Sequence, residues 1–122
     1  MGNIKNYILA NGGCTLDCEL NLYSGAGYVV SREGYEFTSS NIDEIVNKID
    51  EYKATARELE AYIGVWYNTE DGLYYLDINN IYADKKEAIF YGLKFKQLAI
   101  FDIANGQEIR MDNLSYADYN AM

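Results

Sequence analysis

The clearest hydrophobic pattern in the chain lies between residues 42 and 63. Asn41 precedes it as a candidate N-cap, and Asp43 and Glu44 are acids suited to a first helical turn. We therefore predict a helix over residues 41–62 that Gly64 ends. Apolar or small residues recur there with the 3.6-residue spacing of one helix face, at Ile42, Ile45, Val46, Ile49, Tyr52, Ala56, Leu59 and Ile63.

Shorter patterns before this helix predict an antiparallel sheet in the N-terminal third. The apolar run at 6–10 ends in Asn-Gly-Gly, which is a turn signal. Residues 18–24 alternate between apolar and polar, as a half-buried strand does. Residues 28–32 predict a third strand, and Gly34 is suited to a turn into the segment YEFTS.

The second half of the chain predicts two hairpins around a shorter helix. The segments are 65–68 with 73–78, then a helix at 85–96 capped by Asp84, then 98–103 with 107–111 across a two-residue Asn105-Gly106 turn. Alternation places Trp66 and Tyr67 on opposite faces of the sheet. The predicted fold is a single α+β domain over residues 1–111, with one long and one shorter helix packed on an antiparallel sheet, followed by a flexible C-terminal tail at 112–122.

The composition is that of a folded, cytoplasmic protein. The chain has 122 residues, of which 49% are hydrophobic and 24% charged, so it has the composition of a chain that buries a core. No apolar run approaches the roughly 20 residues that span a bilayer, and the N-terminus lacks the pattern of a signal peptide. In a reducing cytoplasm Cys14 and Cys18 are expected to be free thiols on or near strands.

The absence of histidine removes the commonest general base at neutral pH. It excludes Ser-His-Asp and Cys-His catalytic arrangements, and no spaced motif indicates carboxylate or lysine chemistry. A zinc site would need carboxylates beside the two cysteines. We therefore predict a protein that is not an enzyme and that carries no metal and no cofactor.

The net charge of −9 predicts repulsion of nucleic acid and of anionic membranes. An anionic ligand would have to be held by a local cationic cluster, because charges beyond about 8 Å are largely screened at physiological salt. Arginine is best suited to this task, since its planar guanidinium donates two parallel hydrogen bonds to phosphate. The three arginines are Arg32 after a strand, Arg57 on the long helix, and Arg110 on the last strand.

Each arginine has an alternative interpretation as a solvated surface residue or as the partner of one of the nineteen acids. Aromatic rings supply the complementary half of a nucleotide site, because a base stacked on a ring gains roughly 1–3 kcal/mol. The alternative for each ring is a place in the core or in a subunit interface. The candidates are Trp66, Tyr67, Tyr74, Tyr75, Tyr82, Phe90 and Tyr91.

Several segments together resemble a known family of small phage proteins. They are GYVVSREGYEF, SSNIDEIV, GVWYNTEDGLYYLDI and AIFYGLKFKQLAIFDIANGQEI, and the resemblance covers residues 26–110. The chain resembles the Thoeris anti-defence family, whose members act as sponges for cyclic ADP-ribose isomers made by bacterial TIR-domain enzymes. The resemblance is most specific in KQLAIFDIANGQEI and looser elsewhere.

The resemblance implies a binding protein in the cytoplasm of an infected bacterium, with ligand pockets between the subunits of a homodimer or larger homo-oligomer. It implies phosphate contacts from Arg57 and Arg110. Further ligand contacts are expected from Lys96, Gln97, Trp66 and Tyr82. Lys96 stands where the family pattern has Asn, so a contact at that position would be altered.

Two other functions compete with the sponge. One is an acidic inhibitor that mimics DNA and blocks a restriction or CRISPR nuclease. The long helix carries acids that such a mimic would use, although the acids along the whole chain are scattered rather than spaced like phosphates: Asp43, Glu44, Asp50, Glu51, Glu58 and Glu60. The other is a structural or accessory phage protein with no ligand.

Overall fold

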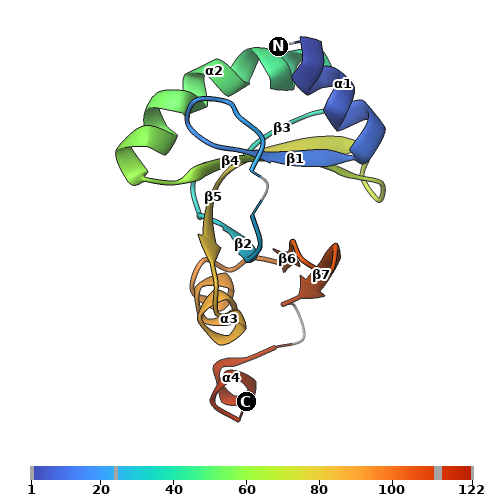
Figure 1. The fold of residues 1–122 in the computed structure, drawn as a ribbon. Helices are drawn as coiled ribbons and strands as arrows, with labels where there is room; N and C mark the ends of the chain where they lie inside the picture. Colours follow the sequence, from blue (N-terminus) through green and yellow to red (C-terminus); the bar gives the residue numbers. More distant parts are fainter. Residues whose placement is uncertain (1, 24, 112–113, 122) are drawn as a thin grey trace. The chain divides into compact units, whose positions relative to one another are not determined.

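A computed structural model describes residues 2–23, 25–111 and 114–121 of the chain (Figure 1). The fold is α+β with an antiparallel sheet, as the sequence predicts. The chain divides into two compact units, an N-terminal unit of residues 2–23 and 34–78 and a C-terminal unit of residues 25–33 and 79–121. The elements are α1 (Gly2–Asn11), β1 (Gly13–Leu16), β2 (Tyr28–Ser31), β3 (Phe37–Ser39), α2 (Ile42–Leu59), β4 (Tyr62–Asn68), β5 (Leu73–Tyr82), α3 (Lys85–Lys94), β6 (Ala99–Asp102), β7 (Gln107–Arg110) and α4 (Tyr116–Asn120).

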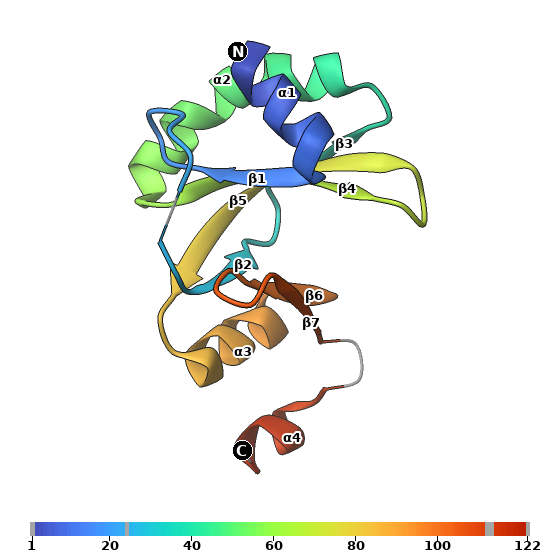
Figure 2. The same cartoon turned by 45° about the vertical axis from the view of Figure 1, so that its right-hand side comes forward.

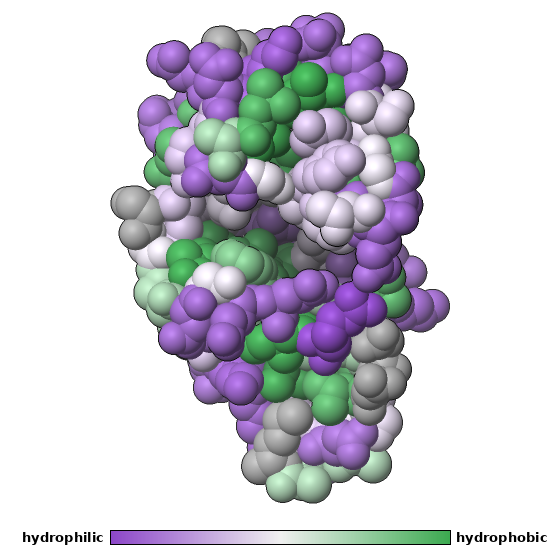
Figure 3. Space-filling model, turned by 90° about the vertical axis from the view of Figure 1, so that its right-hand side faces the viewer, coloured by the Kyte–Doolittle hydropathy of each residue, from purple (hydrophilic) through white to green (hydrophobic). Residues whose placement is uncertain are grey.

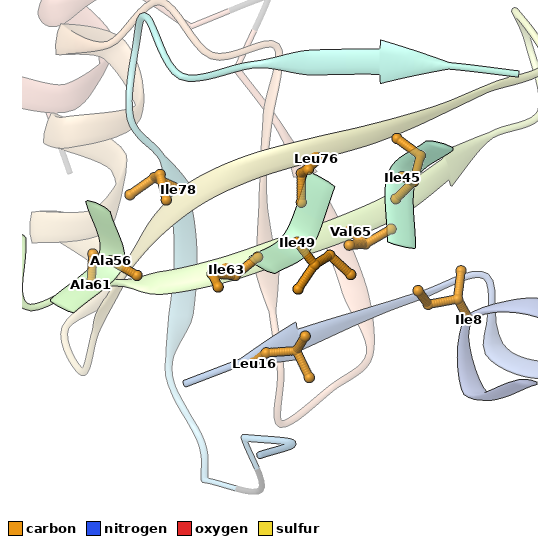
Figure 4. Close-up of a cluster of buried hydrophobic side chains, with 10 residues drawn as sticks. All are labelled: Ile8, Leu16, Ile45, Ile49, Ala56, Ala61, Ile63, Val65, Leu76 and Ile78. Atoms are coloured by element: carbon orange, nitrogen blue, oxygen red, sulfur yellow. The ribbon is translucent and has the colours of Figure 1, made fainter. Parts of the chain in front are cut away.

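In the N-terminal unit, β4 lies between β1 and the first part of β5, and β3 pairs with β5 on its other side. Helices α1 and α2 both cover the same face of β1 and β4 (Figures 1 and 2). Side chains from this face and from the two helices form the core of the unit (Figure 4). The largest fully buried members are Ile8, Leu16, Ile45, Ile49, Ile63, Leu76 and Ile78.

Helix α2 forms where the 3.6-residue stripe predicts it, with Ile45 and Ile49 fully buried. The Asn41 side chain accepts a hydrogen bond from the backbone N–H of Asp43 at 2.9 Å, which satisfies one of the free donors of the first turn. The prediction that Gly64 ends the helix is wrong. The helix ends at Leu59, and Glu60 caps it in a left-handed conformation with φ 52°, whereas Gly64 lies inside β4 opposite Thr15.

Two predicted strands are absent from the N-terminal unit. Residues 6–10 belong to helix α1, because the short apolar run supplies a buried Ile8 and Lys5 forms an ion pair of 2.7 Å with Asp43. Residues 18–20 form a turn and a bend, and Leu22 makes only an isolated antiparallel bridge to Leu16 rather than a strand. The Asp17 carboxylate accepts the backbone N–H groups of Glu19 and Asn21, and this local pairing competes with a strand ladder.

The C-terminal unit contains the last part of β5, followed in the sheet by β2, β6 and β7. Asp84 caps α3 as predicted, with its carboxylate accepting the N–H of Glu87. One face of this sheet packs against α3, with Val30 and Ile100 buried against Ala88 and Ile89.

Two details of the C-terminal unit differ from the prediction. The turn between β6 and β7 has four residues, 103–106, rather than two, because Asp102 pairs directly with Gln107. Within the predicted tail, residues 116–120 form helix α4, where Ser115 and Asp118 make a capping box. Residues 112, 113 and 122 of that tail lie outside the described residues. Among the described helices, none has the length and apolar character needed to cross a membrane.

Candidate functional site

The site with the best chemistry for a nucleotide lies within the C-terminal unit, around two stacked tyrosines. Tyr82 is the last residue of β5 and pairs with Tyr28 of β2. Alternation puts Tyr82 on the face that α3 covers, where it meets Tyr91 of that helix. The two rings are nearly parallel, with centroids 4.8 Å apart and an interplanar angle of 4°.

The register of β2 on β5 places Arg32 on the same face of the sheet as this pair, four positions along the chain from Tyr28. Val30 pairs with Asn80 and Tyr28 with Tyr82, so Arg32 follows on the same side of the ladder. The Arg32 guanidinium donates from Nη1 to the Oδ1 atom of Asn80 at 3.3 Å. Arg32 is half-buried, which holds its charge against the sheet rather than free in solvent.

The pKa of Tyr82 reflects several neighbouring groups, among them Arg32. Burial raises the pKa of Tyr82, and the neighbouring Tyr91 phenol and the Glu87 carboxylate raise it further, whereas Arg32 acts in the opposite direction. A tyrosine hydroxyl is protonated at neutral pH even without this shift, so Tyr82 serves as a hydrogen-bond donor. Arg32 and Tyr82 thus each offer a hydrogen-bond donor on this face of the sheet.

A second cation contacts the Tyr91 ring. The Lys94 ammonium lies 5.7 Å from the centroid of the Tyr91 ring, within the range of a cation–π contact. The Phe95 ring lies 6.0 Å from that of Tyr91 and extends the aromatic surface. In a chain with a net charge of −9, a cation beside stacked tyrosines forms a local environment suited to an anion with an aromatic ring.

A shallow hollow of about 260 Å³ lies at the end of the β2–β5 pair where Tyr28 pairs with Tyr82, away from Arg32. Its walls are small residues, among them Gly27, Ala83 and Ala104. Asp102 lines it and is only 7% exposed, and its carboxylate accepts a hydrogen bond of 2.6 Å from the Asn105 side chain. A carboxylate in such a hollow is a suitable acceptor for sugar hydroxyl groups.

Of the residues predicted from the sequence, Tyr82 belongs to this site. Lys96 and Gln97 lie in the turn after α3. Lys96 is exposed and has a φ of 55°, and the Gln97 side chain donates to the backbone oxygen of Phe95. Arg110 lies on β7 with its guanidinium 3.5 Å from the Glu108 carboxylate, and Ile109 and Met111 pack into the core on the opposite face, as alternation predicts.

The remaining two predicted residues lie in the N-terminal unit. Arg57 is exposed in the last turn of α2. Trp66 lies on β4, is 44% exposed, and stacks on Tyr75 of β5. The predicted separation of Trp66 and Tyr67 is confirmed, since Tyr67 contacts Tyr74 instead.

The acids of α2 are the feature on which a DNA mimic would depend. Two of the six are held in ion pairs, Asp43 with Lys5 at 2.7 Å and Glu51 with Lys48 at 2.9 Å. These pairs neutralise part of the charge that a mimic would present. Within the described part of the chain, no group of three or more acidic or thiol side chains is arranged to hold a metal ion.

Comparison with known proteins gives no relative for this chain. No protein-family model matches it, and no curated protein or solved structure is significantly similar to it.

The sequence singles out Arg32 as one of three candidate arginines but does not place it with Tyr82. That placement depends on the pairing of β2 with β5, whose hydrogen-bonded partners Ser31 and Asn79 are 48 positions apart. Asn80 was not predicted at all. Its only signal is that it stands two positions before Tyr82, and hence on the same face of the strand.

Proposed function

We propose that this chain is a phage anti-defence protein that binds a cyclic ADP-ribose isomer and sequesters it without cleaving it, in the cytoplasm of the infected host. The observation that carries the proposal is that Arg32, hydrogen-bonded to Asn80, lies on the same face of the sheet as the stacked rings of Tyr82 and Tyr91. The resemblance of residues 26–110 to the Thoeris anti-defence family supplies the class of ligand.

The ligand would use the two halves of this site differently. Its pyrophosphate accepts hydrogen bonds from the Arg32 guanidinium, with the Tyr82 hydroxyl as a second donor. Its adenine lies against the aromatic surface that Tyr91 and Phe95 form beside Lys94. The Asp102 hollow is separate from Arg32 along β2 and would accept the hydroxyl groups of a ribose.

The energetics of sequestration require a closed pocket. A nanomolar dissociation constant corresponds to about −12 kcal/mol. Two charge-assisted hydrogen bonds at about 1.5–3 kcal/mol each and one base stack at about 1–3 kcal/mol give less than this before the cost of association. Further groups are therefore needed, and in the proposed assembly a second subunit supplies them, with Arg57 and Arg110 as the candidates from the sequence.

Thermal unfolding in the presence of individual cyclic ADP-ribose isomers tests this proposal. A ligand at 100 times its dissociation constant stabilises the folded protein by about 2.7 kcal/mol, so one isomer is expected to raise the melting temperature by several degrees. Arg32→Ala is expected to abolish the shift. Lys5→Ala, which removes the same charge from the ion pair with Asp43, is the matched control and is expected to retain it.

Two results would contradict the proposal in different ways. A flat response of the folded wild-type protein to every isomer would reject sequestration of this class of ligand. The melting temperature of Arg32→Ala could instead still rise with the isomer, while that of Arg57→Ala or Arg110→Ala does not. In that case the class of ligand would stand, and the binding site would lie at the residues that the sequence predicts.

A further inference from the structure

The stacked rings of Trp66 and Tyr75 project from the sheet of the N-terminal unit. They lie in one row across four strands, in which Trp66 is opposite Gly13 on β1 and Tyr75 is opposite Thr38 on β3. Both flanking residues are small, so no large side chain stands beside either ring in this row. Trp66 is 44% exposed. One face of the indole is covered by Tyr75, and the opposite face has only Gly13 across from it.

Carboxylates lie at the hydroxyl end of this aromatic pair. The Tyr75 hydroxyl donates to Asp71, which is exposed in the turn between β4 and β5, and Glu70 is exposed beside it in the same turn. The hydrogen bond to Asp71 raises the pKa of Tyr75, burial adds to this, and the charge of Glu36 acts in the same direction. Glu36 is therefore close enough for its charge to act on the pair, and the surroundings of the rings are negative.

Aromatic rings beside carboxylates favour a cation as the contacting group. The face of an aromatic ring carries a negative electrostatic potential that attracts cations, and tryptophan attracts them most strongly. A phosphate or another anion would be repelled by the carboxylates at short range. Arginine is the natural side chain that fits best, because its planar guanidinium stacks on a ring while its N–H groups donate to carboxylates.

We propose that the Trp66–Tyr75 pair is a contact surface for a basic partner protein. An exposed arginine of the partner stacks on the indole of Trp66, and further cations of the partner pair with the carboxylates of Glu36, Glu70 and Asp71. A protein is favoured over a small cation because the rings project from the sheet, whereas sites for small molecules are concave. Trp, Tyr and Arg are also the residue types that dominate the energetics of protein interfaces. The net charge of −9 speeds the encounter with a basic surface.

This surface is distinct from the acids of α2, because α2 covers the opposite face of the sheet (Figures 1 and 2). Figure 3 views the molecule from the side towards which the turn between β4 and β5 projects in Figure 1. Side chains of intermediate hydropathy, coloured white to pale purple, gather there on the N-terminal unit. A DNA mimic would depend on charge alone, whereas the proposed contact also depends on the rings, so the two can be separated by experiment.

Titration with short peptides tests the proposal, because Trp66 is the only tryptophan and its emission reports binding at this surface. The probes are a glycine-serine peptide that carries several arginines and the same peptide with lysine or with glutamate at those positions. The arginine peptide is expected to change the emission and to bind about twofold to fivefold more tightly than the lysine peptide of equal charge. The glutamate peptide is expected not to bind. The surface uses neither Arg32 nor Tyr82, so failure here would leave the proposed function unaffected.

Variants of the rings and of the acids separate stacking from charge, with affinities measured by calorimetry. Trp66→Leu is expected to weaken binding of the arginine peptide about twofold to fivefold and to remove its preference over the lysine peptide. Glu36→Gln combined with Glu70→Gln keeps the rings and is expected to weaken both basic peptides. The matched control combines Glu44→Gln with Glu58→Gln, which removes the same charge from exposed positions of α2 and is expected to leave both affinities nearly unchanged.

Circular dichroism checks that each variant is folded, which is expected because the substituted side chains are exposed. Equal affinity of the wild type for the arginine and lysine peptides, or a preference for arginine that survives Trp66→Leu, would overturn the proposal. Equal losses in the two glutamine pairs would also overturn it, because the charge of the whole chain would then attract the peptides. Titration with AMP covers another occupant: an emission change with AMP and none with the arginine peptide would assign the surface to nucleotides. An emission that no probe alters would reject the contact.

Discussion

The indole ring of Trp66 lies against the phenol ring of Tyr75, with centroids 4.6 Å apart and an angle of 23° between the planes. The two residues belong to neighbouring strands, β4 and β5, and lie on the face of the N-terminal unit that α1 and α2 do not cover. The Tyr75 hydroxyl donates to the Asp71 carboxylate, and this hydrogen bond lowers the pKa of Asp71. The Tyr75 ring is thus held by the stacked indole of Trp66 on one face and by the ionised carboxylate of Asp71 at its hydroxyl.

Tyr75→Ala is expected to destabilise the protein by about 1 kcal/mol, which is the usual contribution of an aromatic cross-strand pair. Trp66 is the only tryptophan, so its fluorescence reports on this contact directly. The emission is expected to shift to longer wavelength when the ring of Tyr75 is removed. Tyr75→Phe keeps the stack and is expected to leave the emission unchanged, whereas an unaltered spectrum in Tyr75→Ala would contradict the stacked geometry.

Glu60→Gly is expected to stabilise the protein. Glu60 ends α2 in a left-handed conformation with φ 52° and ψ 47°, which costs about 1–2 kcal/mol for a residue with a side chain and very little for glycine. Because glycine also loses more entropy on folding, the expected gain is up to about 1 kcal/mol. Urea denaturation measures it as a higher midpoint.

Glu58→Gly provides the matched control for this substitution. Glu58 is exposed within the last turn of the same helix, where glycine is expected to cost about 1 kcal/mol. The two variants carry the same chemical change, so opposite signs isolate the effect of the backbone conformation. A lower midpoint for Glu60→Gly would show that the helix does not end in this way.

Stability is expected to fall in alkaline solution because of Cys14. Burial raises the pKa of this thiol from 9.0 to about 12, so the folded state holds the proton more tightly than the unfolded state does. The contribution of this proton to the free energy of unfolding is fully present below pH 9. It is lost as the pH rises from 9 towards 12, by up to about 1.4 kcal/mol per pH unit.

Urea denaturation at pH 8, 9.5 and 10.5 checks this slope. The same measurement is made on Cys14→Ala. Tyrosines titrate over this range in the wild type and in the variant, so the informative quantity is the difference between the two. The variant lacks the thiol and is expected to lose less stability between pH 9.5 and 10.5. Parallel curves would show that Cys14 reaches solvent in the folded protein.

The sequence predicts elements well where the pattern is long or the local chemistry is strong. Helix α2 has five turns of apolar spacing and an Asn41 cap, and α3 begins at Asp84 as expected. The run at residues 6–10 is too short for its periodicity to distinguish a strand from a helix. In the structure it is part of helix α1, with Ile8 buried in the core. The Asp17 turn was missed because side-chain capping overrides the alternation of 18–24.

The candidate site is harder to predict, since it depends on strand register. The alternation that separates Trp66 from Tyr67 is a local property and is confirmed by their ring contacts. The neighbourhood of Arg32 and Tyr82 follows from pairing between segments about fifty residues apart, which a single sequence does not specify. The contacts proposed for Arg57 and Arg110 remain predictions from the resemblance.

The most direct measurement of sequestration is the fate of the ligand. The protein is incubated with an equimolar cyclic ADP-ribose isomer, separated from free ligand by gel filtration, heated to unfold it, and the released small molecule is identified by mass spectrometry. The account predicts that one isomer elutes with the protein and is recovered intact in near-stoichiometric amount. No isomer is expected to elute with Arg32→Ala. Recovery of a hydrolysed product, or the absence of any isomer from the protein fraction, would contradict it.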